Sequence, residues 1–487
     1  MKQILYLLLG CLIPFQFLTA KMYSSPERTP VDYVNPYIGN ISHLLVPTYP
    51  TVHLPNSMLR VYPERENFTG NTINGLPLIV TSHRGSSAFN LSPYQGELQK
   101  AGSIIQYGYD NEVIKPYYYS VDLDDDGMYV QYAPSHQSGI YQIDFSQTDK
   151  PAYLIFNTRN GELKTDGKSI SGYQKLGNHT QVYIYLETDQ QPLKIGTHQG
   201  AVIRTTDKST QGHNAYYILE YPKGTASVLL RYGVSFISSE QAKQNLRREI
   251  KNYNLQAVAD KGRSVWNETL GKIFVKGGTE NEKTVFYTSL YRTYERMICI
   301  SEDGRYFSAY DGQVHDDEGI PFYVDDWIWD TYRATHPLRL IIETEMESNM
   351  VNSLIRMAYQ MQPNWMPTFP EINGDSRRMN CNHGVATVLD AYNKGMRSFD
   401  LAKAYQVCKA AITEKTLAPW SSKPAGVLDQ FYKDHGYFPA LAVGEQETVP
   451  EVHSWERRQP AAVTLGTVYD EWCLGNIAQA LGDKKEA

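Results

Sequence analysis

The chain has 487 residues, more than a single hydrophobic core usually organises, so its length predicts two or three domains. Its 46 basic and 53 acidic residues give a net charge of −7 at pH 7 without a basic arm, which argues against nucleic acid as a partner. Tyrosine supplies 37 residues against 15 phenylalanines, and this excess favours half-exposed aromatic surfaces of the kind that handle carbohydrate.

The first 20 residues follow the pattern of a secretory signal peptide. Lys2 supplies a positive charge, a mostly apolar stretch follows, and Ala20 is a small residue suited to cleavage. A Leu-Leu-Gly-Cys sequence ending at Cys11 has the shape of a lipidation site, but the apolar residues continue past it, which favours ordinary cleavage over a lipoprotein. No later segment reaches the roughly 20 apolar residues of a membrane span. We therefore expect an exported protein, periplasmic, cell-surface or secreted, without a transmembrane segment.

Residues 31–238 have the pattern of an antiparallel β-sandwich. Apolar and polar residues alternate at 181–187, and 227–234 reads as a more buried strand. Turn sequences such as Asn160-Gly161 recur at short intervals, as the hairpins of a large sandwich require. The sequence therefore predicts an N-terminal β-sandwich domain at 31–238.

The period of the apolar residues changes after residue 238. Residues 239–273 are polar and helix-prone, which predicts linker helices between two domains. From 274 to 487 apolar residues recur at spacings of three and four, and they predict helices at 282–300, 331–345, 347–362, 384–394, 400–413 and 464–481. Paired helices with long, aromatic-rich connections predict an α/α toroid whose connections carry the chemistry.

One connection, residues 325–333, combines three carboxylates with two indoles. Indole faces stack on the apolar C–H faces of a pyranose, and carboxylates accept hydrogen bonds from its hydroxyls. At the start of a helix, Trp329 and Asp330 can both line a concave site. The alternative is that an aspartate caps the helix and the tryptophans belong to the core.

A second connection, residues 365–375, is also rich in indole, carboxylate and amide groups. Glu371 or Asp375 could act on a sugar as acid or base. Alternatively, the prolines stiffen the loop and the carboxylates cap the next helix. His383 follows at a helix start, and it lacks metal-ligand spacing to His315 and His336.

Several segments, in order along the chain, resemble glycoside hydrolase family 92, the calcium-dependent exo-α-mannosidases. They are residues 32–39, 286–291, 329–333 with 336–338, 383–395 and 469–473. The resemblance implies an N-terminal β-sandwich against an (α/α)6 barrel, with the site between them. It also implies that terminal α-mannosides are hydrolysed with inversion by two carboxyl groups roughly 6.5–9.5 Å apart. Calcium, the implied cofactor, would bind sugar hydroxyls.

The chain departs from the family pattern towards its end. In the family, the acid glutamate, an Asn-Glu-Pro calcium segment and an aspartate-rich base motif follow the helix that matches 469–473, and none of these motifs occurs before Ala487. We therefore expect the catalytic acid and base beyond Ala487, in a longer protein of which this chain is a C-terminally truncated part with an incomplete toroid. No catalytic residue is assigned, and no metal ligand is expected within the chain.

The sequence thus predicts an exo-acting α-mannosidase whose partners are α-mannoside glycans. The predicted substrate-binding residues are Trp329, Asp330, Glu371 and His383. Arg377 and Arg378 replace a more neutral family sequence, so either an anionic mannoside or simple surface solvation could explain them. Two other functions stay open: a non-catalytic carbohydrate-binding protein, and a toroid glycosidase of other specificity.

Overall fold

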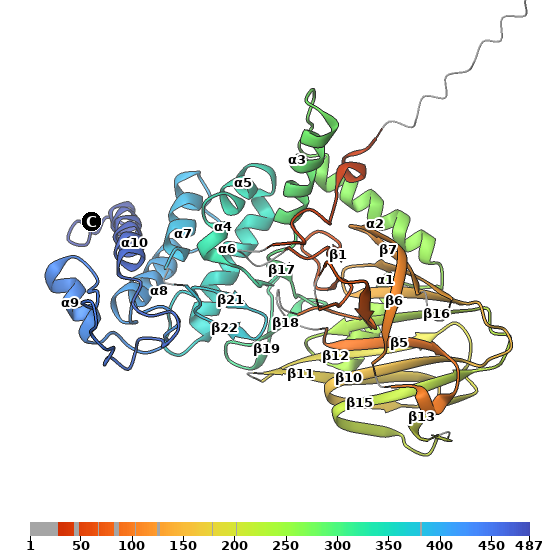
Figure 1. Ribbon diagram of the computed structural model, residues 1–487. Helices are drawn as coiled ribbons and strands as arrows, with labels where there is room; N and C mark the ends of the chain where they lie inside the picture. The colour runs from red at the N-terminus through yellow and green to blue at the C-terminus, as the bar shows by residue number, and fades with distance from the viewer. Residues whose placement is uncertain are drawn as a thin grey trace, which may run out of the picture.

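The computed structural model of the chain describes residues 28–42, 48–66, 68–81, 87–102, 104–123, 127–177, 179–200, 202–379 and 382–487. An N-terminal part built of strands lies beside a C-terminal part built mainly of helices (Figure 1). The predicted signal peptide and Cys11 lie outside the described residues.

The N-terminal part is an antiparallel β-sandwich, as the sequence predicts. Short 3-10 helices lie at Pro30–Tyr33 and Leu98–Lys100. The strands are β1 Val52–His53, β2 Arg60–Val61, β3 Thr72–Asn74, β4 Leu76–Pro77, β5 Phe89–Gln95, β6 Gln106–Lys115, β7 Tyr118–Leu123, β8 Met128–Pro134, β9 Ser138–Phe145, β10 Ala152–Thr165, β11 Ser169–Gly177, β12 Thr180–Thr188, β13 Lys194–Gln199, β14 Val202–Arg204, β15 Ser209–Tyr221 and β16 Ser227–Ser235. The predicted strands at 181–187 and 227–234 are confirmed as β12 and β16.

Strand β10 joins the layers of the sandwich. The main strand order is β14-β13-β15-β10-β11-β12-β16-β9-β8-β7-β6-β3. Along one edge of β10, residues 152–158 pair with β5 and residues 161–165 pair with β11, while β15 runs beside both halves. A strand that changes partner in this way lets one sheet turn into two packed layers.

Tyrosines help to fill the interior of the sandwich. Tyr132, Tyr141 and Tyr232 are buried in one cluster. The hydroxyl of Tyr141 donates to the carbonyl of Pro77 at 2.7 Å, and that of Tyr232 donates to the carbonyl of Leu78 at 2.7 Å. The hydroxyl of Tyr132 lies 3.2 Å from that of Tyr232, so each of these three buried rings has a hydrogen-bond partner for its hydroxyl. Part of the tyrosine excess thus serves the core rather than an exposed sugar-binding surface.

The described C-terminal part contains helices and short two-stranded antiparallel sheets. The helices are α1 Ser239–Glu249, α2 Leu255–Leu270, α3 Glu280–Thr293, α4 Ile328–Thr331, α5 Thr335–Ile342, α6 Thr344–Gln360, α7 Gly384–Asn393, α8 Leu401–Thr413, α9 Val427–His435 and α10 Pro460–Ala480. The sheets pair β17 Ile298–Cys299 with β20 Tyr323–Val324, β18 Arg305–Ser308 with β19 Gln313–Asp316, and β21 Pro370–Glu371 with β22 Gly374–Asp375. The sequence did not predict α9 or these short sheets.

Three predicted helix boundaries were wrong. Asn254 caps a new helix by accepting from the backbone N–H of Ala257 at 3.0 Å, so the predicted linker helix is divided into α1 and α2. The helix predicted at 282–300 ends at Thr293, because residues 298–299 pair with β20. The helix predicted at 331–345 is broken, since Pro337 is tolerated only in the first turn of a new helix, α5.

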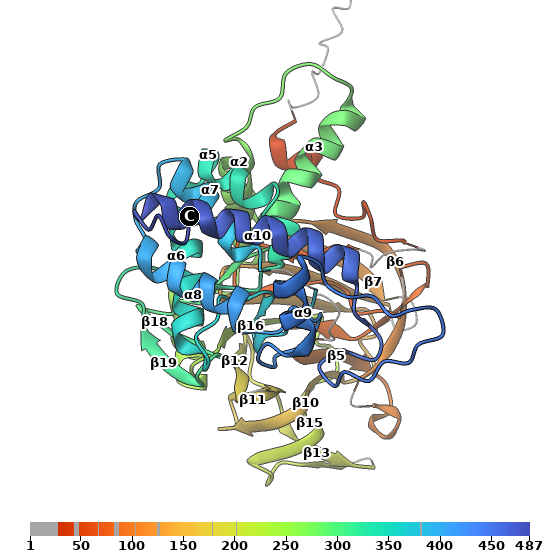
Figure 2. The ribbon, with the colours of Figure 1, turned by 90° about the vertical axis from the view of Figure 1, so that its left-hand side faces the viewer.

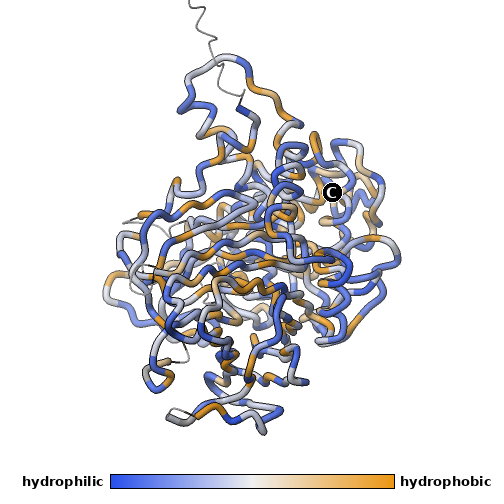
Figure 3. The backbone as a smooth tube through the Cα atoms, turned by 90° about the vertical axis from the view of Figure 1, so that its right-hand side faces the viewer, coloured by the Kyte–Doolittle hydropathy of each residue, from blue (hydrophilic) through white to orange (hydrophobic). Residues whose placement is uncertain are grey.

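The helices pack on one another and on the sandwich (Figure 2). Helices α7, α8 and α10 contact each other, α6 contacts α8, and one apolar core runs from Val52 in β1 to Ile477 in α10. Apolar and polar stretches alternate along the described residues (Figure 3). On α10, Leu465, Val468 and Trp472 stay exposed opposite the buried face. Among the described residues, no helix combines the length and the apolar character needed to cross a bilayer.

Candidate functional site

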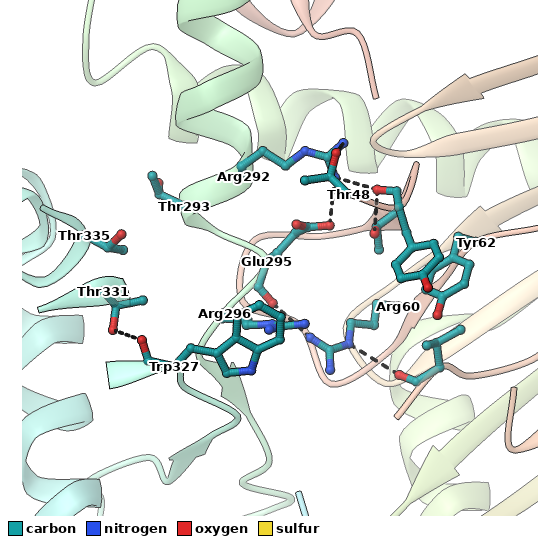
Figure 4. A pocket seen from close by; sticks show the side chains of 13 residues that line it. Thr48, Arg60, Tyr62, Arg292, Thr293, Glu295, Arg296, Trp327, Thr331 and Thr335 are labelled. Atoms are coloured by element: carbon teal, nitrogen blue, oxygen red, sulfur yellow. Dashed lines mark hydrogen bonds and ion pairs between the residues drawn. The ribbon is translucent and has the colours of Figure 1, made fainter. Parts of the chain in front are cut away.

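A cavity of about 230 Å³ lies where the β-sandwich meets the helical part (Figure 4). We call it the inter-domain cavity. Its lining comes from the segment around β2, the C-terminal end of α3, and the region of α4 and α5. The lining residues are Thr48, Tyr49, Thr51, Arg60, Tyr62, Val80, Arg292, Thr293, Glu295, Arg296, Trp327, Thr331 and Thr335. Concave sites at domain boundaries are frequent ligand-binding sites.

Aromatic rings form part of the wall of the inter-domain cavity. Tyr49 stacks on Tyr62 with a centroid distance of 4.4 Å and an interplanar angle of 6°. Across the cavity, the guanidinium of Arg296 lies 3.8 Å from the ring centroid of Trp327, and Phe369 stacks on the same indole at 5.6 Å. These rings are held in place by their neighbours, so they offer fixed apolar faces next to hydrogen-bonding groups.

The carboxylate of Asp325 joins the two sides of the cavity. Arg60, in β2, donates to Asp325 Oδ2, and Arg296 Nε lies 3.5 Å from the same oxygen. Asp325 has φ +67, a left-handed conformation that costs energy for a residue with a Cβ. Burial lowers the pKa of Arg296, and Asp325 opposes that shift. A buried carboxylate shared by two arginines thus fixes a strained connection between the domains.

Glu295 places a carboxylate in the wall of the inter-domain cavity. Arg292 Nη1 lies 3.1 Å from Glu295 Oε1, and the same guanidinium donates to the carbonyls of Tyr49 at 2.6 Å and Pro36 at 2.8 Å. Burial would raise the pKa of Glu295, but Arg292 and then His53 outweigh it and lower the pKa. Glu295 is therefore an ionised acceptor at neutral pH.

A buried charge network lies behind the helical wall. His336 Nε2 is 2.8 Å from Asp326 Oδ2, and its Nδ1 is 2.7 Å from Glu347 Oε1. These three side chains are at most 2% exposed. Burial would lower the pKa of His336, but Glu347 and Asp326 outweigh it and raise the pKa to about 9. His336 is therefore an imidazolium at neutral pH, with each ring N–H donating to a carboxylate.

A second cavity of about 180 Å³ adjoins the first. Its lining residues are Thr81, Leu176, Asp325, Glu371, Ile372, Asn373 and Arg378. Asp325 borders this cavity, while its partners Arg60 and Arg296 border the inter-domain cavity, so the ion pairs separate the two. Burial raises the pKa of Glu371, and Arg378, whose Nη1 is 3.5 Å from Glu371 Oε1, offsets part of that shift.

The segment 325–333 contributes to the inter-domain cavity through Trp327 and Thr331. Trp329 and Asp330 are not among its lining residues. Both lie in the short helix α4, where Trp329 is 38% exposed and Asp330 is also exposed. Burial, followed by the nearby charge of Asp326, raises the pKa of Asp330. Asp330 makes no capping hydrogen bond in α4, so the alternative of a helix cap does not explain it.

The other predicted residues lie apart. His383 is buried, its Nδ1 is 2.6 Å from Asp470 Oδ1 in α10, and its ring is 4.2 Å from that of Tyr332. It joins α7 to α10 and lines neither cavity. The carboxylate of Asp375 accepts hydrogen bonds from the backbone N–H groups of residues 368, 369 and 377. These hydrogen bonds fix the conformation of its loop. Glu371 therefore lines a cavity, whereas His383 lies in the contact between α7 and α10.

Sequence reasoning missed Arg60, Glu295 and Arg296. Arg60 lies in a two-residue strand, and its role depends on pairing with Asp325, 265 positions away. A weak local signal existed for the others, because Arg292, Glu295 and Arg296 form a charged group directly after the segment 286–291. Without the fold, that group is equally typical of a solvated helix end.

The described residues do not fit a calcium site. Calcium takes six to eight oxygen ligands. No group of three or more histidine, cysteine, aspartate or glutamate side chains suited to a metal occurs in the described part of the chain. At the cavities, Asp325, Asp326 and Glu295 are each paired with arginine or histidine. A mechanism built on these residues therefore contains no calcium step.

Comparisons with known proteins identify relatives over both parts of the chain. A curated protein described as an uncharacterized secreted glycosidase, from Arthroderma benhamiae, is 21% identical over 98% of this chain and 63% of its own length. The structure of a family GH92 inverting mannosidase from Bacteroides thetaiotaomicron matches with a TM-score of 0.81 and 25% identity, over 94% of this chain and 63% of that one. An α-mannosidase from the same organism, solved with mannoimidazole, matches with a TM-score of 0.81 and 21% identity, over 94% and 62%.

This chain therefore spans less than two thirds of the length of these relatives. Two family profiles match it in succession. The profile described as the glycosyl hydrolase family 92 N-terminal domain covers residues 33–235, and the profile of the family's catalytic domain covers residues 241–487. The inter-domain cavity is lined by residues from both matched regions. The sandwich, the helices that follow it and these two matches show that the chain belongs to glycoside hydrolase family 92.

Proposed function

We propose that the chain contributes a sugar-binding cavity to an exo-acting α-mannosidase that hydrolyses terminal α-mannosides of glycans with inversion. The observation that carries the proposal is the inter-domain cavity, which lies between the two matched family 92 domains and combines aromatic faces with charged hydrogen-bonding groups. The resemblance to a solved inverting mannosidase supports the choice of mannosides.

Each group in the cavity has a role that follows from its chemistry. Tyr49 and Tyr62 would pack against the C–H faces of a pyranose, whereas Trp327, which is covered by Arg296 and Phe369, would hold the Arg296 guanidinium in position. Arg296 can only donate hydrogen bonds, and the ionised carboxylate of Glu295 can only accept them. Together they would orient the ring by its hydroxyls.

Proton transfer is not assigned to the described residues. Inversion needs one protonated and one ionised carboxyl group on opposite faces of the sugar. Glu295, Asp325 and Asp326 are each paired with a cation, which holds them as anions and fixes their positions. These carboxylates therefore suit binding and positioning. The family resemblance implies calcium as a cofactor, but no role is assigned to it because the described residues do not fit a calcium site.

We also propose that the protein is exported. The signal-peptide pattern of the first 20 residues supports export, and so does the description of the fungal relative as secreted.

Binding is the first test. The chain is titrated with methyl α-D-mannoside, methyl α-D-glucoside and methyl α-D-galactoside, and aryl α-mannoside hydrolysis is followed with calcium and then with chelator. Preferential binding of the mannoside supports the proposal. Binding without hydrolysis under either condition would favour a carbohydrate-binding role for this chain. Equal or absent binding of all three sugars would contradict the mannoside assignment.

A matched pair of variants locates the binding site. Glu295→Gln keeps the shape of the side chain but removes its charge, and we expect mannoside affinity to fall about tenfold, since hydrogen bonds to charged groups contribute roughly 1.5–3 kcal/mol. Glu318→Gln is the control, because its side chain is 80% exposed and lines neither cavity. Equal affinity in both variants would place the sugar elsewhere.

The sequence-predicted contact Asp330 is tested separately. Asp330 is exposed and makes no hydrogen bond as a helix cap, so Asp330→Asn should leave the fold intact. We expect weaker mannoside binding if Asp330 contacts the sugar, as the sequence predicts. Wild-type affinity in this variant would remove Asp330 from the binding site.

A further inference from the structure

Two threonine hydroxyls of the inter-domain cavity direct their protons to protein carbonyls. Thr293 Oγ1 donates to the carbonyl of Leu290 at 2.7 Å, and Thr48 Oγ1 donates to that of Ile38 at 2.9 Å. A hydroxyl has one proton and two acceptor lone pairs. Once its proton is directed to a protein carbonyl, a threonine can only accept a hydrogen bond from a ligand.

The hydroxyl of Thr331 also directs its proton to protein acceptors, and one of them is the carboxylate of Asp326. Its Oγ1 lies 2.9 Å from Asp326 Oδ1 and 3.1 Å from the carbonyl of Trp327. Both neighbours are acceptors, so the single hydroxyl proton points to one of them under either arrangement. Thr331 lines the cavity, and its hydroxyl is directed at the carbonyl of Trp327 (Figure 4). With its proton so directed, the hydroxyl can only accept a hydrogen bond from a ligand that reaches it.

Asp326 acts as an acceptor because His336 keeps it ionised. Burial would raise the pKa of Asp326, but His336 outweighs it and lowers the pKa. The charged groups around His336 come from several elements: Asp326 precedes α4, Glu347 belongs to α6, and Arg339 lies one turn along α5. If Asp326 were protonated, its own O–H could donate to Thr331, which would free the threonine proton for a ligand.

The network is also fixed in space. The backbone N–H of Asp326 donates to the carbonyl of Pro370 in β21 at 2.8 Å. Arg339, only 2% exposed, donates to the carbonyls of Thr293, at 2.7 Å, and of Arg296, both from cavity-lining residues. His336 and Arg339 thus hold the α3 end and the α4 start, the two segments that build the helical wall, in one arrangement.

We propose that Thr331 is a specificity-determining residue that accepts a hydrogen bond from a ligand hydroxyl and cannot donate one, and that His336 is the positioning residue that sets this polarity through Asp326. The cavity would then recognise sugar hydroxyls as donors through its threonines, and as acceptors through its arginines. Naming the ligand as a pyranoside rests on the proposed function, whereas the polarity of Thr331 does not.

Sugar analogues test this polarity directly. Wild-type chain and Thr331→Val are titrated with methyl α-D-mannoside and with its monodeoxy and monofluoro analogues at each ring hydroxyl. Fluorine cannot donate, so at one position the deoxy and fluoro analogues should both bind wild type about tenfold more weakly than the parent sugar. In Thr331→Val this penalty should fall below about twofold. A fluoro analogue that binds wild type like the parent at every position, or an unchanged penalty in Thr331→Val, would overturn the proposal.

A pH series tests the positioning role of His336. Discrimination against the deoxy analogue should be constant in wild type between about pH 5 and pH 8, because His336 keeps Asp326 ionised. In His336→Asn, burial acts on Asp326 without that cation, so discrimination should be weaker than in wild type and should fall further as pH is lowered. Thr331→Val should show no such change. Equal discrimination by wild type and His336→Asn across this pH range would contradict the role of His336. Unfolding curves at each pH confirm that the chain stays folded.

Nitrogen-15 NMR of the His336 imidazole separates this inference from the proposed function. Two protonated ring nitrogens at pH 7 are expected. A neutral imidazole would refute the positioning role of His336 even if mannosides bind. A doubly protonated imidazole in a chain that binds no methyl α-D-mannoside would instead refute the mannosidase proposal and the choice of ligand, and leave the polarity of Thr331 standing.

Discussion

The two walls of the inter-domain cavity are held in place by different means. On the sandwich side, Arg60 lies in a strand and its guanidinium bonds to backbone carbonyls and to Asp325. On the helical side, the wall includes the four-residue helix α4, and a buried network of Asp326, His336 and Glu347 lies behind it. A strand receives its geometry from neighbouring backbone, whereas so short a helix depends on side-chain charges for its position.

The largest expected loss of stability comes from a substitution that disrupts the helical wall. His336→Ala leaves the carboxylates of Asp326 and Glu347 buried without their shared cation, and we expect a loss of about 3–5 kcal/mol in unfolding free energy. Chemical denaturation followed by tryptophan fluorescence measures it. His435→Ala, at an exposed position, is the control and should change stability by less than about 0.5 kcal/mol. Equal effects of the two substitutions would mean that the network does not hold the wall.

A smaller loss is expected on the sandwich side. Arg60→Met keeps the length of the side chain but removes one of the two arginines that pair with Asp325. Since Arg296 remains as a partner, we expect about 2 kcal/mol of destabilisation, below the usual cost of breaking a buried pair. Denaturation under the same conditions gives the comparison. A loss larger than that of His336→Ala would reverse the ranking of the two walls.

The walls should also differ in their response to pH. The pKa of His336 is raised from 6.5 to about 9, so its contribution to stability is fully present below about pH 6.5 and is lost as pH rises through about 9. Thermal unfolding between pH 6 and pH 10 should therefore show a falling midpoint in wild type and in Arg60→Met, and a flatter profile in His336→Asn. Parallel profiles in all three proteins would contradict this assignment.

The smallest expected change in stability tests whether an ion pair must be buried to stabilise the fold. Lys394 Nζ lies 2.6 Å from Asp390 Oδ2, but the side chains are 41% and 35% exposed. Lys394→Met should change the unfolding free energy by less than about 0.5 kcal/mol, because exposed pairs separated by four residues contribute little. A loss above about 1 kcal/mol would show that the exposed pair matters as much as a buried one.

Much of the fold could be predicted because its signals are local. Alternation at 181–187 identified β12, and apolar spacings of three and four identified α6, α7, α8 and α10. The sequence did not predict the short sheets between the helices, since strands such as β17 and β20 are two residues long and pair across more than 20 positions. Strands of that length carry no periodic signal, and only their partner makes them extended.

The candidate site was predicted only in part. The sequence predicted that the segment 325–333 is a sugar-binding connection, and two of its residues line the inter-domain cavity, while Glu371 lines the second cavity. Within the segment, however, Trp327 and Thr331 line the inter-domain cavity, while Trp329 and Asp330 stay predicted contacts on the exposed side of α4. Composition could identify the segment but not the direction of each side chain, because the direction depends on where α4 starts and ends.

The sequence by itself determined the order of sandwich and helices, and the resemblance it carries pointed to family 92. These depend on the period of apolar residues and on short motifs, which are local properties of the chain. Tertiary structure alone decided that Asp325 and Asp326, neighbours in sequence, serve opposite sides. Asp325 pairs with Arg60 of the sandwich, and Asp326 pairs with His336 of α5. The physical reason is that a buried charge takes its role from the partner brought to it, and folding supplies those partners from distant positions.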